Sequence, residues 1–174
     1  IMAQCGYFVA SKDFKFKPYK QIFSRILNND NIFKSQSSFA VEMSELRSIL
    51  HNVNENSLVL GDELCSGTET ISALSIVSTG LKFLSEKKCS FAFTSHLHQL
   101  HSISIMKDIK NLNIFHLKIR IENDILIYDR KLERGPGPTL YGLLVSEAMG
   151  LPKDFISMAK QVELELTGES KTLV

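Results

Sequence analysis

The chain has 174 residues, of which 44% are apolar and 22% charged, a composition typical of globular proteins and sufficient for one hydrophobic core. The formal net charge is only +1 and the 20 basic residues are scattered, so no electrostatic footprint for nucleic acid stands out. The three cysteines form no CxxC pair, which argues against a disulfide framework or a zinc knuckle. The cysteine usage indicates a reducing, intracellular setting. No apolar run approaches the roughly 20 residues of a membrane helix, so we expect a soluble protein without a membrane partner.

The first clear pattern along the chain is a helix followed by a buried strand. Over residues 39–53 apolar side chains recur at the spacing of one helix face, which predicts a helix of about four turns. Ser37 and Ser38 precede it as candidates for the N-cap. Residues 58–60 are apolar throughout, which is typical of a parallel strand buried on both faces.

A second helix and a second strand follow. Apolar residues recur at helical spacing over residues 71–84, and Ser66 and Glu69 have the spacing of a capping box before that helix. Residues 89–93 then predict another buried strand. A strand, a helix and a strand within about 35 residues form a βαβ unit, so we expect two parallel strands joined by a right-handed crossover.

The pattern changes after the βαβ unit. Residues 113–130 form two partly alternating runs around a turn at residues 122–124, which predicts an antiparallel hairpin. Two short helices are expected after it, over residues 140–149 and 153–166. The predicted fold class is therefore α/β, with an antiparallel hairpin and C-terminal helices.

Two adjacent acids, Asp62 and Glu63, stand where the first predicted strand ends. In a parallel α/β sheet the working residues gather at the carboxyl ends of the strands. The first acid would hold Mg²⁺ through its water shell while the second orients or deprotonates an attacking water, as in a Walker-B-like pair. The alternative is that acids simply end a strand at the surface, and the pair alone does not decide between these interpretations.

Three histidines, His96, His98 and His101, follow the second predicted strand. Because one helix joins the two strands, their carboxyl ends should face the same crevice. One interpretation is a zinc or manganese site completed by Asp62, and a metal-dependent phosphoesterase would use Asp62, His96 and His98. The other is a single histidine, His96, that donates a hydrogen bond to negative charge developing on a γ-phosphate.

A nucleotide-hydrolysing site also needs a loop whose backbone N–H groups cradle the phosphates, usually GxxxxGK(S/T). No glycine of the sequence opens that pattern, and no Gly-Lys pair occurs in the chain. The Gly-Pro-Gly-Pro stretch at residues 135–138 is a poor substitute, because proline lacks the N–H and no lysine follows. Either the acids serve another chemistry, or the phosphate loop lies upstream of Ile1.

Five stretches occur in a characteristic order: AQCGYFVA, IFSRILNND, SSFAVEMSELRSILHNVNENSLVLGDELCSGTET, FTSHLHQL and LYGLLVSEAMGLP. Together they resemble the ATPase domain of MutS, the DNA mismatch-repair family, over most of the chain. The resemblance implies part of an ABC-type P-loop NTPase sheet and an ATPase that works as a dimer, with composite sites for ATP and Mg²⁺. The family's phosphate loop normally lies just before the segment resembling residues 3–10, so we expect it upstream of Ile1. This chain would then be a fragment that is inactive alone.

The resemblance also implies roles for individual residues. Asp62 resembles the family's Walker B magnesium acid, Glu63 its catalytic glutamate and His96 its switch histidine. Ser37 resembles the serine that reaches the γ-phosphate bound by the opposite subunit. The other matches are Gly67 and Thr68, in the loop that crosses the dimer interface, and Gln4, which resembles the glutamine after the phosphate-loop helix.

Departures from the family's pattern suggest a divergent branch. Cys-Ser at residues 65–66 replaces the usual Gly-Arg after the Walker B acids, and Ser-Gln at residues 35–36 replaces Gly-Arg before the signature serine. Ser-Ala at residues 72–73 replaces an Asp-Gly pair. These changes leave the hydrolytic acids intact but put communication between the two sites in doubt.

The function implied is part of a DNA mismatch-repair ATPase, which hydrolyses ATP in composite dimer sites to control clamping on mismatched or distorted double-stranded DNA. Domains outside this chain would bind that DNA. Residues 1–139 would be the C-terminal part of the ATPase domain, and residues 140–174 a helical dimerisation tail. Two alternatives stay open: the last helices merely pack back on the sheet, or the isolated chain is only a dimerising module. Whether the dimer is homo- or heteromeric, and in which compartment it works, stays open as well.

Overall fold

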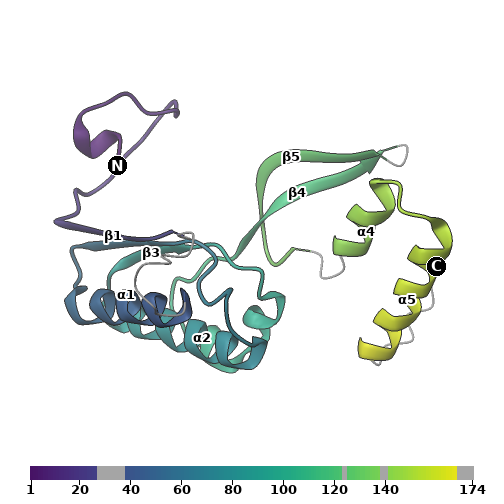
Figure 1. Ribbon diagram of the computed structural model, residues 1–174. Coiled ribbons are helices and arrows are strands. Elements are labelled where there is room, and N and C mark those ends of the chain that lie inside the picture. Colours follow the sequence, from purple (N-terminus) through teal and green to yellow (C-terminus); the bar gives the residue numbers. More distant parts are fainter. Residues whose placement is uncertain (27–37, 123–124, 138–140, 168–174) are drawn as a thin grey trace. The chain divides into compact units, whose positions relative to one another are not determined.

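The computed structural model describes residues 1–26, 38–122, 125–137 and 141–167 (Figure 1). It divides into two compact units, Ile1–Leu112 and Asn113–Val174, which are described separately below. The domain boundary predicted after position 139 falls in residues 138–140, which lie outside the described residues, and it stays a prediction.

The first unit is built on a parallel sheet of three strands in the order β1-β2-β3. Its strands are β1 (Gln21–Arg25), β2 (Ser57–Gly61) and β3 (Ser90–Phe93). Two long helices, α1 (Ser38–Asn52) and α2 (Thr70–Glu86), lie on one face of this sheet (Figure 1). The predicted helices, the positions of the two predicted strands and their parallel pairing are therefore confirmed. The burial predicted for the second strand is wrong, because the residues of β3 alternate between exposed and half-buried.

The core of the first unit explains why these segments adopt their structure. Ser57, Val59 and Gly61 of the central strand β2 are buried, as expected for a strand with neighbours on both sides. The helix α2 turns one face inward at about every third or fourth residue. The side chains that it buries include Ala73, Val77, Leu81 and Leu84. From α1, the buried apolar side chains are Leu46 and Ile49, and Glu42 is buried as well.

Periodicity did not predict strand β1. Of its five residues only Ile22 and Phe23 are apolar, so it lacks both an alternating pattern and a continuous apolar run. The strand forms because its backbone pairs with β2 in parallel register, from Gln21 opposite Ser57 to Arg25 opposite Gly61. Short elements were not predicted either: two 3-10 helices, η1 (Ala3–Cys5) and η3 (His98–Ser102), and the helix α3 (Ser104–Lys107).

The second unit contains the predicted hairpin and the two predicted helices. Strands β4 (Phe115–Glu122) and β5 (Ile125–Arg134) pair in antiparallel register, so β5 continues beyond the predicted end at residue 130. The helices are α4 (Tyr141–Ala148) and α5 (Lys153–Thr167). The whole is a mixed α/β structure with a parallel sheet and an antiparallel hairpin, as the coarse fold class predicted. None of the helices in the described residues is long and apolar enough to cross a membrane.

Candidate functional site

The carboxyl ends of β2 and β3 lie side by side. Gly61 is the register partner of Phe93, and the N–H of Thr94 donates to the carbonyl of Gly61 at 3.0 Å. On the other side of β2, the N–H of Asp62 donates to the carbonyl of Arg25 at 2.8 Å. The residues that follow these strands therefore meet at one edge of the sheet, as predicted.

Glu63 and His96 are in direct contact at this edge. Oε1 of Glu63 lies 2.6 Å from Nε2 of His96. The contact is open to solvent, because 36% of the Glu63 side chain and 78% of the His96 side chain are exposed. A carboxylate and an imidazole at this distance form an ion pair when the imidazole is protonated. The structure therefore brings together two of the residues that the sequence picked out.

Asp62 is held by a residue that sequence reasoning missed. The hydroxyl of Thr94 donates to Oδ1 of Asp62 at 2.5 Å, and the same hydroxyl accepts the N–H of Glu63 at 3.2 Å. A carboxylate accepts at about four lone-pair sites, so this one bond leaves Asp62 able to accept more. The only hint in the sequence was that Thr94 comes directly after a predicted strand.

The backbone of the turn formed by residues 62–65 is unusual. Glu63 has φ of 48° and Cys65 has φ of 64°, both in the left-handed region that residues with a Cβ rarely adopt. Such conformations persist where the surrounding structure enforces them, often at functional sites. Here Leu64 and Cys65 are buried, and the N–H of Cys65 donates to Oε1 of Glu42 at 2.9 Å.

Burial changes the chemistry of the Cys65 thiol. The pKa of Cys65 is raised from 9.0 to about 11, mainly by desolvation and also by the negative charge of Glu42, while Arg25 acts in the opposite direction. The thiol is therefore protonated at neutral pH and is no candidate for a nucleophile.

Gly61 keeps β3 close to the acid pair. A Cβ placed on Gly61 would lie 2.1 Å from Cε1 of the Phe93 ring, well inside van der Waals contact. Only glycine allows the ring to lie against the backbone of β2 at this point. Packing against Phe93 therefore restricts the last residue of β2 to glycine. The two acids, Asp62 and Glu63, follow directly after it.

Gly67 and Thr68 lie between the acid pair and the start of α2. The N–H of Thr68 donates to the carbonyl of Cys65 at 3.4 Å, and Gly67 is exposed. The helix then begins differently from the prediction. Glu69 is itself the N-cap, accepting the N–H groups of Ile71 at 2.8 Å and Ser72 at 2.9 Å, so a capping box led by Ser66 is wrong.

Of the other two predicted nucleotide-binding residues, Gln4 does not lie at this edge. The side-chain amide of Gln4 donates to the carbonyl of Tyr19 at 2.6 Å and accepts the N–H of Tyr19 at 3.0 Å. Tyr19 precedes β1, whose five residues span roughly 16 Å, so Gln4 lies toward the opposite edge from Asp62. Ser37 lies outside the described residues. The roles of both stay predictions.

The three-histidine metal site is not assembled. His98 begins η3, and Nδ1 of His101 lies 2.6 Å from the carbonyl oxygen of His98. In the described part of the chain, no three side chains of the types His, Cys, Asp and Glu are grouped so that they could hold a metal ion. The set Asp62, His96 and His98, which a phosphoesterase would need, therefore does not come together as a transition-metal site.

The donor set fits magnesium. Mg²⁺ prefers oxygen ligands and is usually bound through one or two carboxylates together with waters and substrate phosphates. One carboxylate, Asp62, with a hydroxyl beside it, meets that requirement without a third protein ligand. Glu63 follows Asp62 directly, and 36% of its side chain is exposed.

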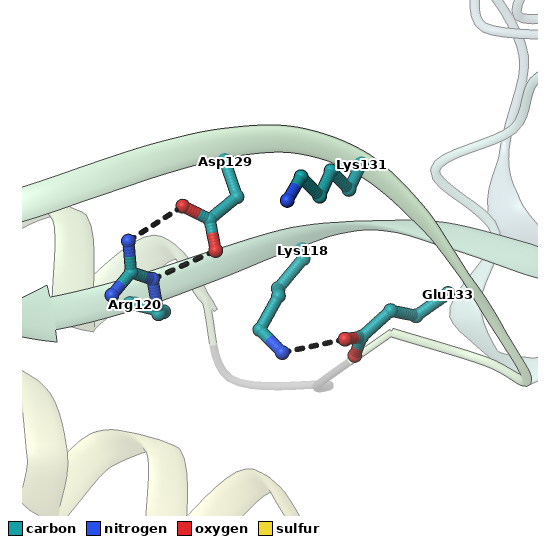
Figure 2. A pocket seen from close by; sticks show the side chains of 5 residues that line it. All are labelled: Lys118, Arg120, Asp129, Lys131 and Glu133. Carbon is teal, nitrogen blue, oxygen red and sulfur yellow. Dashed lines mark hydrogen bonds and ion pairs between the residues drawn. The ribbon is translucent and has the colours of Figure 1, made fainter.

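A second cluster of charged residues lines a shallow hollow on the hairpin (Figure 2). Arg120 donates two parallel hydrogen bonds to Asp129, from Nε at 2.7 Å and from Nη2 at 2.8 Å. Lys118 donates to Glu133 at 2.6 Å. Hydrogen bonds from Arg120 lower the pKa of the Asp129 carboxyl, which is therefore ionised at neutral pH. The hollow is lined by three cations and two acids, and both acids are engaged in ion pairs, so we interpret it as a surface ion-pair network and not as a candidate site.

The sequence of this chain is similar to a known protein family and to several of its members. A family model described as MutS domain V matches residues 1–167. A DNA mismatch repair mutS homolog of Acanthamoeba polyphaga mimivirus is 45% identical over 174 residues, which is 97% of this chain and 16% of that protein. A mitochondrial DNA mismatch repair mutS homolog of Sarcophyton glaucum is 43% identical over 151 residues, covering 86% of this chain and 15% of that protein.

A bacterial relative is less similar. The DNA mismatch repair protein MutS of Prochlorococcus marinus strain MIT 9301 is 36% identical over 172 residues, which is 98% of this chain and 19% of that protein. The chain thus spans less than a fifth of the length of each of these relatives.

Proposed function

The chain belongs to the MutS domain V family, and from that premise we propose that it carries the hydrolytic edge of an ATPase that acts in DNA mismatch repair. The observation that carries this proposal is the 2.6 Å contact between Glu63 and His96 directly beside Asp62, at the ends of two adjacent parallel strands. Parallel α/β sheets bind their ligands outside the carboxyl ends of the strands.

Glu63 and His96 have complementary roles in this mechanism. Glu63 orients the attacking water and accepts its proton, while His96 holds the carboxylate in place through the contact at 2.6 Å. A γ-phosphate entering the site competes for the imidazole N–H, because it offers more negative charge than the carboxylate. The imidazole then stabilises charge on the phosphate, and Glu63 is released to act on the water.

Asp62 is the residue that would hold Mg²⁺, with the Thr94 hydroxyl fixing the orientation of its carboxylate. Bound Mg²⁺ supplies neutralisation of the charge on the phosphate oxygens. Gly67 and Thr68 follow the acid pair on an exposed loop, where a second protomer can reach them. Ser37 and Gln4 complete the proposed set, Ser37 toward the nucleotide of the opposite subunit.

The partners belong to the proposal as well. Relatives named as DNA mismatch repair proteins are at least five times longer than this chain's match to them, so we assign contact with mismatched or distorted DNA to other parts of such proteins. Hydrolysis in composite dimer sites would control clamping on that DNA. A metal-dependent phosphoesterase is not proposed, because its ligands are not grouped in the described residues.

The deciding experiment uses the complete natural gene product that contains these 174 residues, called the parent protein below. Glu63→Gln should still bind ATP but should hydrolyse it at least a hundredfold more slowly, since an amide cannot accept the proton of the water. Steady-state ATP turnover and equilibrium nucleotide binding measure the two effects separately.

Glu55→Gln is the matched control, because Glu55 is an exposed acid in the loop before β2. It should turn over ATP like the wild type. Unchanged turnover in Glu63→Gln, or a parent protein without ATPase activity, would contradict the proposal. The 174-residue chain alone is expected not to hydrolyse ATP, because its sequence contains no GxxxxGK(S/T) loop.

A further inference from the structure

A buried arginine contacts the turn of residues 62–65 by two routes. Through its backbone, the carbonyl of Arg25 accepts the N–H of Asp62 at 2.8 Å. Through its side chain, Nη2 of Arg25 lies 3.8 Å from Oε1 of Glu42. The same oxygen of Glu42 accepts the N–H of Cys65 at 2.9 Å. Arg25 and Glu42 therefore hold both ends of the turn.

The burial of this pair indicates that it has a specific task. Only 9% of the Arg25 side chain and 5% of the Glu42 side chain are exposed. Ionised groups that are removed from water cost free energy unless they are paired and hydrogen-bonded. Here the carboxylate of Glu42 is matched by a guanidinium and by a backbone N–H, and a charged acceptor makes that N–H bond stronger than a neutral one would.

The turn needs such a restraint because its backbone is unfavourable. Glu63 and Cys65 both have positive φ, at 48° and 64°, without being glycine. A Cys65 N–H without an acceptor would favour another conformation of the turn, and the direction of the Glu63 side chain would change with it.

We infer that Glu42, paired with Arg25, is a positioning residue that fixes the N–H of Cys65 and so aims the Glu63 carboxylate at the edge of the sheet. The inference rests on the ATPase function proposed above and assigns it a further residue. Glu42 acts through the backbone of the turn and does not touch the reacting groups.

Two substitutions distinguish the effect of the length of the Glu42 side chain from the effect of its charge. Glu42→Gln keeps the length of the side chain and a carbonyl oxygen for the N–H of Cys65, but it loses the charge. Glu42→Asp keeps the charge for Arg25, but it is one methylene too short for the bond of 2.9 Å to Cys65. If positioning is the task, Glu42→Gln in the parent protein should keep kcat within about threefold of the wild type. Glu42→Asp should lower kcat at least tenfold, while the Kd for ATP stays unchanged.

Glu45 supplies the matched control. Its Oε2 lies 3.0 Å from Nε of the same arginine, but 42% of its side chain is exposed. Glu45 contacts Arg25, but the N–H of Cys65 donates to Glu42 and not to Glu45. Glu45→Gln should therefore leave kcat within twofold of the wild type.

Hydrogen–deuterium exchange at the Cys65 amide of the parent protein provides a readout that needs no activity. The amide should stay protected in Glu42→Gln and should exchange at least tenfold faster in Glu42→Asp, with thermal unfolding confirming that both variants are folded. The inference is overturned if Glu42→Asp is as active as the wild type while Glu63→Gln is inactive, or if Cys65 exchange is the same in all variants. A parent protein without ATPase activity would instead remove the proposed function, and the exchange experiment would still decide the role of Glu42.

Discussion

Single side chains at the edge of the sheet hold one another in place, as the proposed hydrolysis would require. Thr94 holds Asp62 by a hydrogen bond at 2.5 Å, and His96 holds Glu63 at 2.6 Å. Each acid therefore has one partner from the loop after β3. A carboxylate that is already oriented loses less entropy when substrate arrives, which is how preorganised sites gain rate.

Glu69, the N-cap residue of α2, should make the free energy of unfolding depend on pH. Hydrogen bonds from Ser72 and Ile71 lower the pKa of Glu69 below its ordinary value of 4.5, the side-chain bond from Ser72 contributing most. A lowered pKa means that the ionised form stabilises the folded state. This contribution is fully present above pH 4.5 and is lost as the pH falls through the lowered pKa.

The test compares the thermal unfolding of the wild type and Glu69→Gln as a function of pH. We expect the variant to melt at a lower temperature at pH 7 and the difference to shrink as the pH falls below 4.5, through the lowered pKa of Glu69. Glu55→Gln, an exposed acid outside any helix cap, should show no such difference at either pH. A difference for Glu69→Gln that does not depend on pH would rule out the charged cap as its cause.

Residue-level prediction from the sequence succeeded where position along a strand decides the outcome. Asp62, Glu63 and His96 were found because they directly follow predicted strands, and topology alone brings such residues to one edge. The partners Thr94, Glu42 and Arg25 were missed. Their hydrogen bonds and ion pairs depend on how elements distant in the sequence pack together. The periodicity of apolar residues within one element carries no information on that packing.

At the scale of elements, the close packing of β2 against β3 depends on Gly61 having no side chain. Gly61→Ala should destabilise the protein by about 1–3 kcal/mol, because the added methyl group would meet the ring of Phe93. In a Phe93→Ala background the same substitution should cost much less, since the ring is gone. Chemical denaturation of the four variants of this cycle measures the coupling.

Gly80 provides a control, because its substitution by alanine should change the stability in the opposite direction. It lies within α2, and nothing lies within 4 Å of the position that a Cβ would occupy. Gly80→Ala should therefore stabilise the protein by about 0.5–1 kcal/mol, because alanine loses less backbone entropy in a helix. If Gly61→Ala were equally stabilising, the close approach of the two strands would be refuted.

Element prediction was reliable where one face of a segment is apolar. The helices α1 and α2 were recognised from their spacing, and the hairpin from alternation around a polar turn. Strand β1 was missed because hydrogen bonds to β2, and not its own apolar side chains, keep it in the sheet. On α5 helical spacing places the apolar residues at 155, 159, 162 and 166 on one face, but that face is not the buried one. The structure instead buries Ile156, which is 3% exposed, and leaves Phe155 and Val162 about half exposed.

At the scale of the whole molecule, the exposed apolar residues of α5 are a candidate contact surface for the proposed dimer. Phe155, Met158 and Val162 recur at helical spacing and are 50%, 59% and 51% exposed. A second copy of the chain could cover this stripe through a two-fold contact. Val162→Glu would place like charges near the symmetry axis and should weaken the dimer at least tenfold.

Sedimentation of the parent protein over a range of concentrations measures this effect. Gln161→Glu is the matched control, because it adds the same charge at the neighbouring exposed position. It should leave the association unchanged. A dimer that tolerates Val162→Glu would show that these helices do not form the contact.

The three thiols differ in a way that has a practical consequence. Cys65 and Cys89 are buried, and burial raises the pKa of both, whereas Cys5 is exposed. Alkylating reagents attack the thiolate, so near neutral pH they discriminate between solvent-facing and enclosed sulfur atoms. The chain therefore offers one natural attachment point for a fluorophore or spin label, well separated in sequence from the acid pair, without the removal of any cysteine.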